Sequence, residues 1–156
     1  MMRNENMIEP QNHALSKTAV MRGCGWLKQN FIMKPQEIRI GNFVSFFNND
    51  ILKISAVFEN GIHDKHYNGY EYNDIHPIPL NEKWLLDFGF KEEEKNLFTL
   101  RQSPIIFNVH KNLISNEFMI RMVTNYSFLV ENVHHLQNLF FEIAKQELKL
   151  KKENGL

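Results

Sequence analysis

The way apolar residues are grouped along the chain constrains its fold most. Between residues 37 and 130 they occur in short runs rich in β-branched and aromatic residues, and Asn, Gly, Pro and Ser separate the runs. Such runs, bounded by turn residues, are typical of short antiparallel strands. Near the C-terminus the spacing changes to three and four, which is typical of an amphipathic helix. The sequence therefore predicts an α+β fold built from two small antiparallel β-rich halves.

The first β-rich half is predicted over residues 33–80. Asn48, Asn49 and Asp50 predict a tight hairpin turn, because Asn and Asp tolerate positive φ better than other residues with side chains. Short strands joined by tight turns favour a small curled sheet, and an SH3-like barrel is one way to close it. Strands are expected at residues 37–40, 43–47, 51–58, 62–63 and 70–72.

The second half, residues 81–150, opens with a well-specified short helix at Glu82–Phe88. Asn81 is a favourable N-cap, Leu80 and Leu85 suit a hydrophobic staple, and Gly89 suits the left-handed residue after a helix. We expect an acidic turn at residues 91–95, strands at 97–100, 105–109, 118–123 and 126–129, and a longer C-terminal helix from Val133 to about Leu148.

The ends of the chain differ from these two halves. Residues 1–32 show neither strand nor helix periodicity, so we expect a flexible extension, with Met33 as the start of the folded domain. This extension is either a tail without a role or a segment that folds on a partner through Trp26 and Phe31. Residues 151–156 are expected to form a tail.

The composition narrows the choice of compartment and partner. Cys24 is the one cysteine, which excludes an internal disulfide and suits a reducing, cytoplasmic environment. No run of about 18 apolar residues predicts a membrane span. Eighteen basic and eighteen acidic residues give zero net charge. A protein that holds nucleic acid mainly by charge tends to carry a basic excess, which this chain lacks.

Three segments resemble a known family: EIRIGNFV at 37–44, IHPIPLNEKWLLDFGF at 75–90, and VENVHHLQNLFFEIAKQEL at 130–148. Together they resemble a family of small uncharacterised proteins common in Bacteroidota genomes and in their phages and mobile elements. The resemblance covers about Met33 to Leu150. It implies that the protein is encoded in such a genome, phage or mobile element. It implies no activity and no site residue, because the family has no agreed activity. Relatives often have a Thr-Gly turn where this chain has residues 144–146, so its last helix is expected to run longer.

A cluster of imidazoles and carboxylates lies between residues 63 and 76, and these groups are competent ligands for zinc or manganese. The spacing fits no established ligand motif, and the segment has the composition of an exposed loop, so we predict no metal or other cofactor. The residues of this cluster are His63, Asp64, His66, Asp74 and His76.

A second histidine pair, His134 and His135, opens the last helix. Adjacent helical residues point about 100° apart, so the pair is poorly placed to chelate one ion. We expect one of the two to be packed and the other solvated, and His134 could hydrogen bond with Asn138 one turn later.

No residue pattern indicates catalysis. Cys24 lies in the unpatterned extension, no serine stands in a nucleophile-elbow sequence, and residues 23–25 lack the remaining features of a phosphate loop. Residues 92–94 are typical of a solvated turn, whereas catalytic carboxylates need burial or a defined neighbour. We therefore predict that the protein is not an enzyme and has no small-molecule substrate.

Aromatic residues crowd the first half and its long loop, and aromatic side chains often anchor protein interfaces or stack on single-stranded bases. On alternating strand positions about half of them must face the core instead. The candidates for partner binding are Phe46, Phe47, His63, His66, Tyr67, Tyr70 and Tyr72.

The sequence therefore predicts a cytoplasmic protein that works by binding. Given the phage-like setting, we expect an inhibitor of a host defence complex, such as an anti-CRISPR protein acting on an RNA-guided effector nuclease and its guide RNA. One alternative is a nucleic-acid-binding or regulatory module built on the first half. A small metalloenzyme based on the 63–76 loop is the third.

Overall fold

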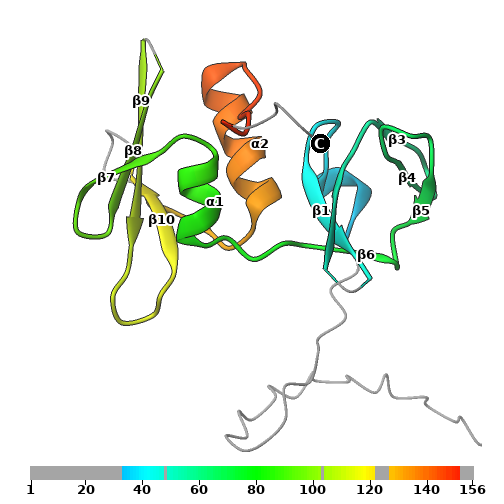
Figure 1. Cartoon of the computed structure of the whole chain (residues 1–156), viewed down its shortest axis with the longest axis horizontal. Helices are drawn as coiled ribbons and strands as arrows, with labels where there is room; N and C mark the ends of the chain where they lie inside the picture. The colour runs from blue at the N-terminus through cyan, green and yellow to red at the C-terminus, as the bar shows by residue number, and fades with distance from the viewer. Residues whose placement is uncertain (1–32, 48, 103, 122–126, 152–156) are drawn as a thin grey trace, which may run out of the picture.

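The computed structural model describes residues 33–47, 49–102, 104–121 and 127–151. The predicted extension at 1–32 and residues 152–156 of the predicted tail lie outside the described residues. Within the described ranges the chain forms an α+β fold, as the sequence predicts (Figure 1). Its elements are η1 (Pro35–Glu37), β1 (Phe43–Phe46), β2 (Asp50–Lys53), β3 (Ala56–Val57), β4 (Gly61–His63), β5 (Gly69–Glu71), β6 (Ile75–His76), α1 (Glu82–Asp87), β7 (Lys91–Glu94), β8 (Leu97–Gln102), β9 (Ile105–Lys111), β10 (Phe118–Arg121), β11 (Ser127–Val130) and α2 (Val133–Ala144).

The small half contains η1 and β1 to β6. Its strands form two antiparallel three-stranded sheets, ordered β2-β1-β6 and β3-β4-β5. An SH3-like barrel is therefore not confirmed. The sheets enclose a core that is mostly aliphatic, made by Met33, Ile38, Val44, Ile54, Ile62, Tyr72 and Ile75.

Two strand predictions in the small half are wrong. The first concerns residues 37–40, where the chain leaves the 3-10 helix η1, buries Ile38 and turns at Gly41. The second concerns residues 51–58, which split into β2 and β3 in different sheets. Ile54 bonds through its backbone to Gly41 and Asn42, whereas the amide of Ser55 already donates to His63. The chain changes sheets between these two residues, and side-chain alternation gives no sign of such a change.

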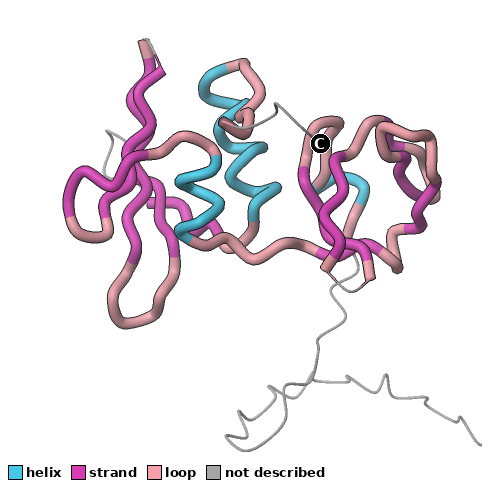
Figure 2. The backbone as a smooth tube through the Cα atoms, in the orientation of Figure 1, coloured by secondary structure: helices cyan, strands magenta, loops and turns pink. Residues whose placement is uncertain are grey.

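The large half is one antiparallel five-stranded sheet, ordered β11-β10-β9-β8-β7, with α1 and α2 on one face (Figure 2). The predicted strands of this sheet are confirmed as β8 to β11, except that residues 122, 123 and 126 lie outside the described residues. The core beneath the helices is rich in phenylalanine and includes Phe88, Phe90, Phe98, Phe107, Phe118 and Phe140.

The predicted acidic turn at 91–95 is wrong, because residues 91–94 form the edge strand β7. Glu92 is paired with Phe98, and the turn falls at Asn96, which has φ 67° and donates its N–H to the Glu92 carboxylate at 3.1 Å. Arg101 on β8 bonds Glu93 through two guanidinium nitrogens. A charged edge strand resembles a turn in sequence, because its side chains all remain exposed.

Helix α1 confirms the predicted local signals. Asn81 caps it by accepting the N–H of Trp84 at 3.1 Å, and Leu80 and Leu85 are both buried. Gly89 follows with φ 100°, a conformation that strains residues with a side chain.

Helix α2 is shorter than predicted. It ends at Ala144, because Lys145 takes a left-handed conformation with φ 52° and its N–H closes on the carbonyl of Phe141 at 2.7 Å. The chain then turns back, and Leu148 fills the large core from outside the helix. The spacing of Leu148 fits a helix by coincidence, so the prediction of a longer helix fails.

Helix α2 also joins the two halves. The buried Gln137 accepts the N–H of Phe43 at 2.8 Å and donates to the carbonyl of Gly41 at 3.0 Å. The Arg39 guanidinium lies 3.5 Å from the ring centre of Phe141 and bonds Glu147 at 2.9 Å. The small half is thereby fixed against α2. In the part of the chain described here, neither helix has the length and apolar character needed to cross a membrane.

Candidate functional site

The loop between β4 and β5 is organised around one carboxylate. Asp64 accepts the backbone N–H groups of His66 at 2.8 Å and of Asn68 at 3.0 Å. It also accepts the Asn68 side-chain amide at 2.9 Å and the Tyr70 hydroxyl at 3.1 Å. Four hydrogen bonds to one side chain give this loop a defined shape, which a composition typical of exposed loops does not indicate.

The same contacts set the ionisation of Asp64. Burial alone would raise the pKa of its carboxyl group, but the hydrogen bonds from Asn68, His66 and Tyr70 stabilise the charged form and lower the pKa to about 2. Asp64 is therefore a carboxylate at neutral pH whose acceptor positions are used within the loop. A structural role within the loop accounts for it, in place of the metal ligation considered from the sequence.

Tyr67 projects from this loop into solvent. Its side chain is 85% exposed, and its backbone has φ 66°, held by an N–H bond to the carbonyl of Asp64 at 3.1 Å. The left-handed region is costly for a residue with a bulky side chain. The loop therefore presents an aromatic ring outward in a conformation that Asn or Gly would adopt more easily.

A second aromatic group lies beside the loop. The ring of Phe46 on β1 contacts Phe47 at 4.3 Å and Tyr70 on β5 at 4.6 Å between centroids, in edge-to-face geometry. Phe47 sits in the hairpin turn with φ 28° and is 62% exposed. The contacts join the two small sheets and leave one ring open to solvent.

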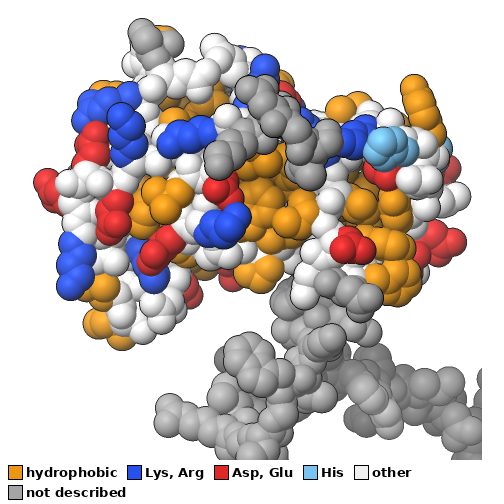
Figure 3. Space-filling view, in the orientation of Figure 1, with side chains coloured by type: hydrophobic (Ala, Val, Ile, Leu, Met, Phe, Trp, Pro, Cys, Tyr) orange, Lys and Arg blue, Asp and Glu red, His pale blue; other side chains and the backbone are white. Residues whose placement is uncertain are grey.

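An open groove of about 420 Å³ continues from Tyr70 across β4 and β5. Phe58 lines it, is 51% exposed and contacts the ring of His63 at 4.6 Å. Sequence reasoning missed Phe58, because it was placed at the end of an expected strand and not weighed as a surface residue. We name the aromatic surface by its members, Phe46, Phe47, Phe58, Tyr67 and Tyr70, and hydrophobic side chains do gather over the small half (Figure 3).

The seven sequence-predicted site residues do not share one environment. Tyr72 is only 9% exposed, donates its hydroxyl to the carbonyl of Phe58 at 2.6 Å and packs in the small core, so it does not belong to the aromatic surface. Burial raises the pKa of Tyr72. His66 is exposed beside Tyr67, and His63 is half-buried against Phe58.

The histidines and carboxylates of the 63–76 segment, considered above as metal ligands, do not converge on one point. Within the described ranges, no three His, Cys, Asp or Glu side chains converge well enough to hold a metal ion. His76 lies on β6 opposite Ser45, while Asp74 lines the groove and Asp64 is held inside its loop.

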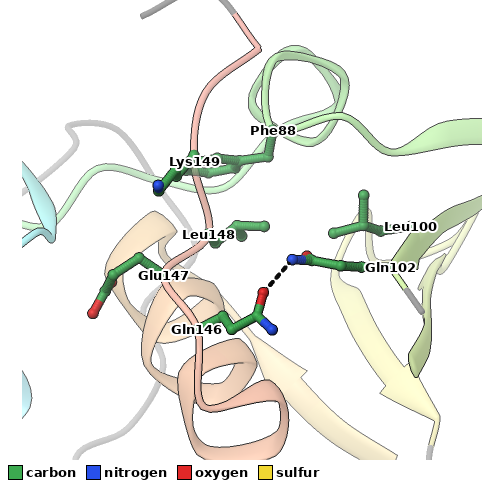
Figure 4. A pocket seen from close by; sticks show the side chains of 7 residues that line it. All are labelled: Phe88, Leu100, Gln102, Gln146, Glu147, Leu148 and Lys149. Atoms are coloured by element: carbon green, nitrogen blue, oxygen red, sulfur yellow. Dashed lines mark hydrogen bonds between the residues drawn. The ribbon is translucent and has the colours of Figure 1, made fainter. Parts of the chain in front are cut away.

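A second groove, of about 430 Å³, lies in the large half between β8 and the segment after α2 (Figure 4). Gln102 donates its amide to Gln146 across it. Glu147 and Lys149 point away from Gln102 in this view, and Glu147 already bonds Arg39. The groove therefore brings together amide and apolar groups and not an acid-base pair.

The histidine pair at the start of α2 divides only in part as predicted, because His134 is packed but His135 is not fully solvated. His134 is 1% exposed and His135 is half-buried, with their rings 4.3 Å apart. The possible bond from His134 to Asn138 does not form. The Asn138 amide donates to the carbonyl of Glu37, and the Asn138 side-chain oxygen and both ring nitrogens of His134 lack a partner among the described residues. Burial, with a smaller contribution from His135, lowers the pKa of His134 to about 3.

Comparison of the chain with protein-family models, with curated proteins and with solved structures found no match in any of the three. Functional inference therefore depends on the geometry just described. Its most distinctive element is a rigid loop and an adjoining hairpin that expose aromatic rings on the small half.

Proposed function

We propose that the protein is a non-catalytic binding protein that engages a macromolecular partner through the aromatic surface. The single observation that carries this proposal is Tyr67, an almost fully exposed aromatic residue kept at positive φ by the Asp64 loop. A fold has no stability reason to hold a tyrosine there, and backbone strain of this kind is concentrated at functional sites.

The chemistry of the surface supports a protein or ribonucleoprotein partner. Its rings can be buried in a partner's pockets, and the hydrogen bonds of Asp64 fix the Tyr70 ring and the backbone of the Tyr67 loop before binding, which lowers the entropic cost of association. Exposed side chains next to it carry both signs of charge, Lys65 and Glu71 among them. This mixture favours recognition by shape and apolar contact over attraction to a polyanion.

For the identity of the partner we propose a host defence complex, such as an RNA-guided effector nuclease. This part of the proposal rests on the resemblance to phage and mobile-element proteins. In this proposal the protein blocks the effector's working surface or holds the effector in an inactive state. One protein molecule per effector then suffices to stop guided cleavage.

The test is affinity purification of the tagged full-length protein from a Bacteroidota host. Mass spectrometry identifies the bound proteins, and sequencing identifies the bound nucleic acid. Three proteins are used: wild type, the variant carrying Phe47→Ser, Phe58→Ser and Tyr67→Asn, and the control Ile114→Ser, which removes a 95% exposed apolar residue from the large half. We expect wild type and the control to recover the same partner and the triple variant to lose it.

Two outcomes contradict the proposal. Equal recovery of one partner by all three proteins would show that the aromatic surface is not the binding site. Recovery of nucleic acid alone, with affinity falling steeply as salt rises, would favour the alternative of a nucleic-acid-binding module. If the purified complex still carried out guided cleavage, the proposed defence target would be rejected. The proposal that the aromatic surface binds a partner would be unaffected.

A further inference from the structure

The two edges of the five-stranded sheet differ in chemistry. Strand β7 forms one edge, and its residues Lys91, Glu92, Glu93 and Glu94 are all exposed and charged. Charged side chains on an edge strand oppose pairing with another chain. Strand β11 forms the other edge, has no charged residue and exposes Phe128 and Leu129 by 46% and 49%. One edge is protected against pairing along its length, whereas in the described part of the chain β11 has no neighbouring strand on its outer side before Glu131, whose carbonyl accepts the N–H of Leu80 at 2.8 Å.

The register of β11 shows where its exposed side chains point. Phe128 lies opposite Ile120, on the face that carries the large core, whereas Leu129 lies opposite Met119 on the face without helices. Phe128 therefore reaches the rim of the core, and its side chain remains 46% exposed. A further strand next to β11 would cover this exposed ring.

From these observations we propose that β11 pairs antiparallel with β11 of a second copy, so that the two sheets become one continuous sheet. A two-fold axis at Phe128 places the two Phe128 side chains opposite each other and Ser127 opposite Leu129. Directly opposed residues in an antiparallel pair point to the same face, so both aromatic rings extend the core side of the joined sheet. The interface is isologous and closes with two copies.

The charges that flank β11 favour a second copy over an unrelated strand. Arg121 lies opposite Ser127 at one end of β11, and Glu131 follows Val130 at the other end. Both are exposed, and within the described ranges neither takes part in an ion pair. Antiparallel self-pairing brings unlike ends together, so Arg121 of each copy faces the Glu131 end of the other. The zero net charge of the chain adds no overall repulsion.

The test is sedimentation equilibrium of the full chain over a range of concentrations. Because the paired strands are short, we expect a dimer that dissociates in the micromolar range. Phe128→Lys and Leu129→Lys place two like charges at the centre of the pair, so each should raise the dissociation constant by about 100-fold or more. The control Ile114→Lys places the same charge on an exposed apolar position away from β11 and should leave the dissociation constant unchanged.

A charge exchange tests the proposed contact between Arg121 of one copy and Glu131 of the other. Arg121→Glu alone and Glu131→Arg alone should each raise the dissociation constant roughly threefold to tenfold, and the double variant should restore the wild-type value. Circular dichroism confirms that each variant is folded. A wild-type monomer up to about 1 mM, or a dimer unaffected by either substitution in β11, would overturn the inference. A dimer disrupted by Tyr67→Asn and not by Leu129→Lys would place the contact on the aromatic surface and overturn it as well.

Discussion

The two halves of this protein treat their aromatic residues in opposite ways. The large half buries most of its phenylalanines beneath α1 and α2, with Phe128 on β11 as an exposed exception, and Phe90, Phe98 and Phe140 are at most 1% exposed. The small half fills its core mainly with aliphatic residues and leaves Phe47, Phe58 and Tyr67 at the surface. Both halves contain antiparallel sheets and aromatic residues, so the difference lies in where each half places its rings.

The contrast separates residues that stabilise the fold from residues available to a partner. In the large half the buried aromatic rings pack within the core, as Phe107 does against Phe90 and Phe140. In the small half Tyr67 is held outward in a conformation unfavourable for tyrosine. The four predictions below test this division, beginning with the largest expected effect.

The sharpest comparison is the loss of one phenylalanine from each half. Phe140→Ala removes a fully buried ring and should lower the free energy of unfolding by about 3–5 kcal/mol. Phe47→Ala removes a mostly exposed ring and should cost less than about 1 kcal/mol. Urea denaturation followed by circular dichroism measures both. Similar losses in the two variants would mean that the halves do not differ as described.

The joint between the halves should be nearly as sensitive. Gln137→Leu leaves the Phe43 N–H and the Gly41 carbonyl without their partner, at a cost of about 2–4 kcal/mol in unfolding free energy. The matched control is Gln102→Leu, because Gln102 bonds the exposed side chain of Gln146, and it should change stability by less than about 0.5 kcal/mol. Equal losses of unfolding free energy in the two variants would show that the hydrogen bonds of Gln137 do not stabilise the contact between the halves.

His134 makes the large half sensitive to acid. Its pKa is about 3 in the folded protein against an ordinary value of 6.5, so the unfolded chain binds the proton first as pH falls. The free energy of unfolding should therefore decrease by up to about 1.4 kcal/mol per pH unit between pH 6.5 and pH 3. His134→Leu removes this dependence and should raise stability above pH 6.5 by about 1–2 kcal/mol, because two unpaired polar atoms disappear.

The measurement is urea denaturation at several pH values, with His135→Leu as the control. That residue is half-buried, so its loss should leave most of the acid dependence in place. If the His134→Leu variant kept the same acid dependence as wild type, the effect would belong to other groups.

The smallest effect on stability is the most informative about function. Tyr67→Asn should leave the free energy of unfolding unchanged or raise it by up to about 1 kcal/mol, because asparagine tolerates positive φ. Partner binding should fall in the same variant. Thermal unfolding and the purification experiment above measure the two quantities separately, and a destabilised Tyr67→Asn protein would show that the ring supports the fold.

Much of this fold could be predicted because the signals are local. The cap at Asn81, the staple of Leu80 and Leu85 and the turn at Gly89 act within a few residues, and α1 follows them. The change of sheets after Ile54 and the end of α2 at Lys145 depend on contacts with distant segments. Periodicity carries no information about such contacts.

The candidate site was predictable only in part for the same reason. Aromatic crowding in the sequence pointed to the half that exposes the aromatic surface, but Tyr70 and Tyr72 have the same residue type, and only the fold separates a groove-lining ring from a core ring. The four hydrogen bonds of Asp64 were hidden in a sequence that resembles an ordinary loop.

The most direct test of the central claim is site-specific photo-crosslinking in the host. A photoreactive phenylalanine derivative replaces Tyr67 in one protein and Ile114 in another, so that the same group is presented by the small and the large half. We predict a discrete crosslinked species from position 67, identifiable by mass spectrometry, and none of comparable yield from position 114. Crosslinking from position 114 alone, or equal yields from both positions, would contradict binding through the aromatic surface.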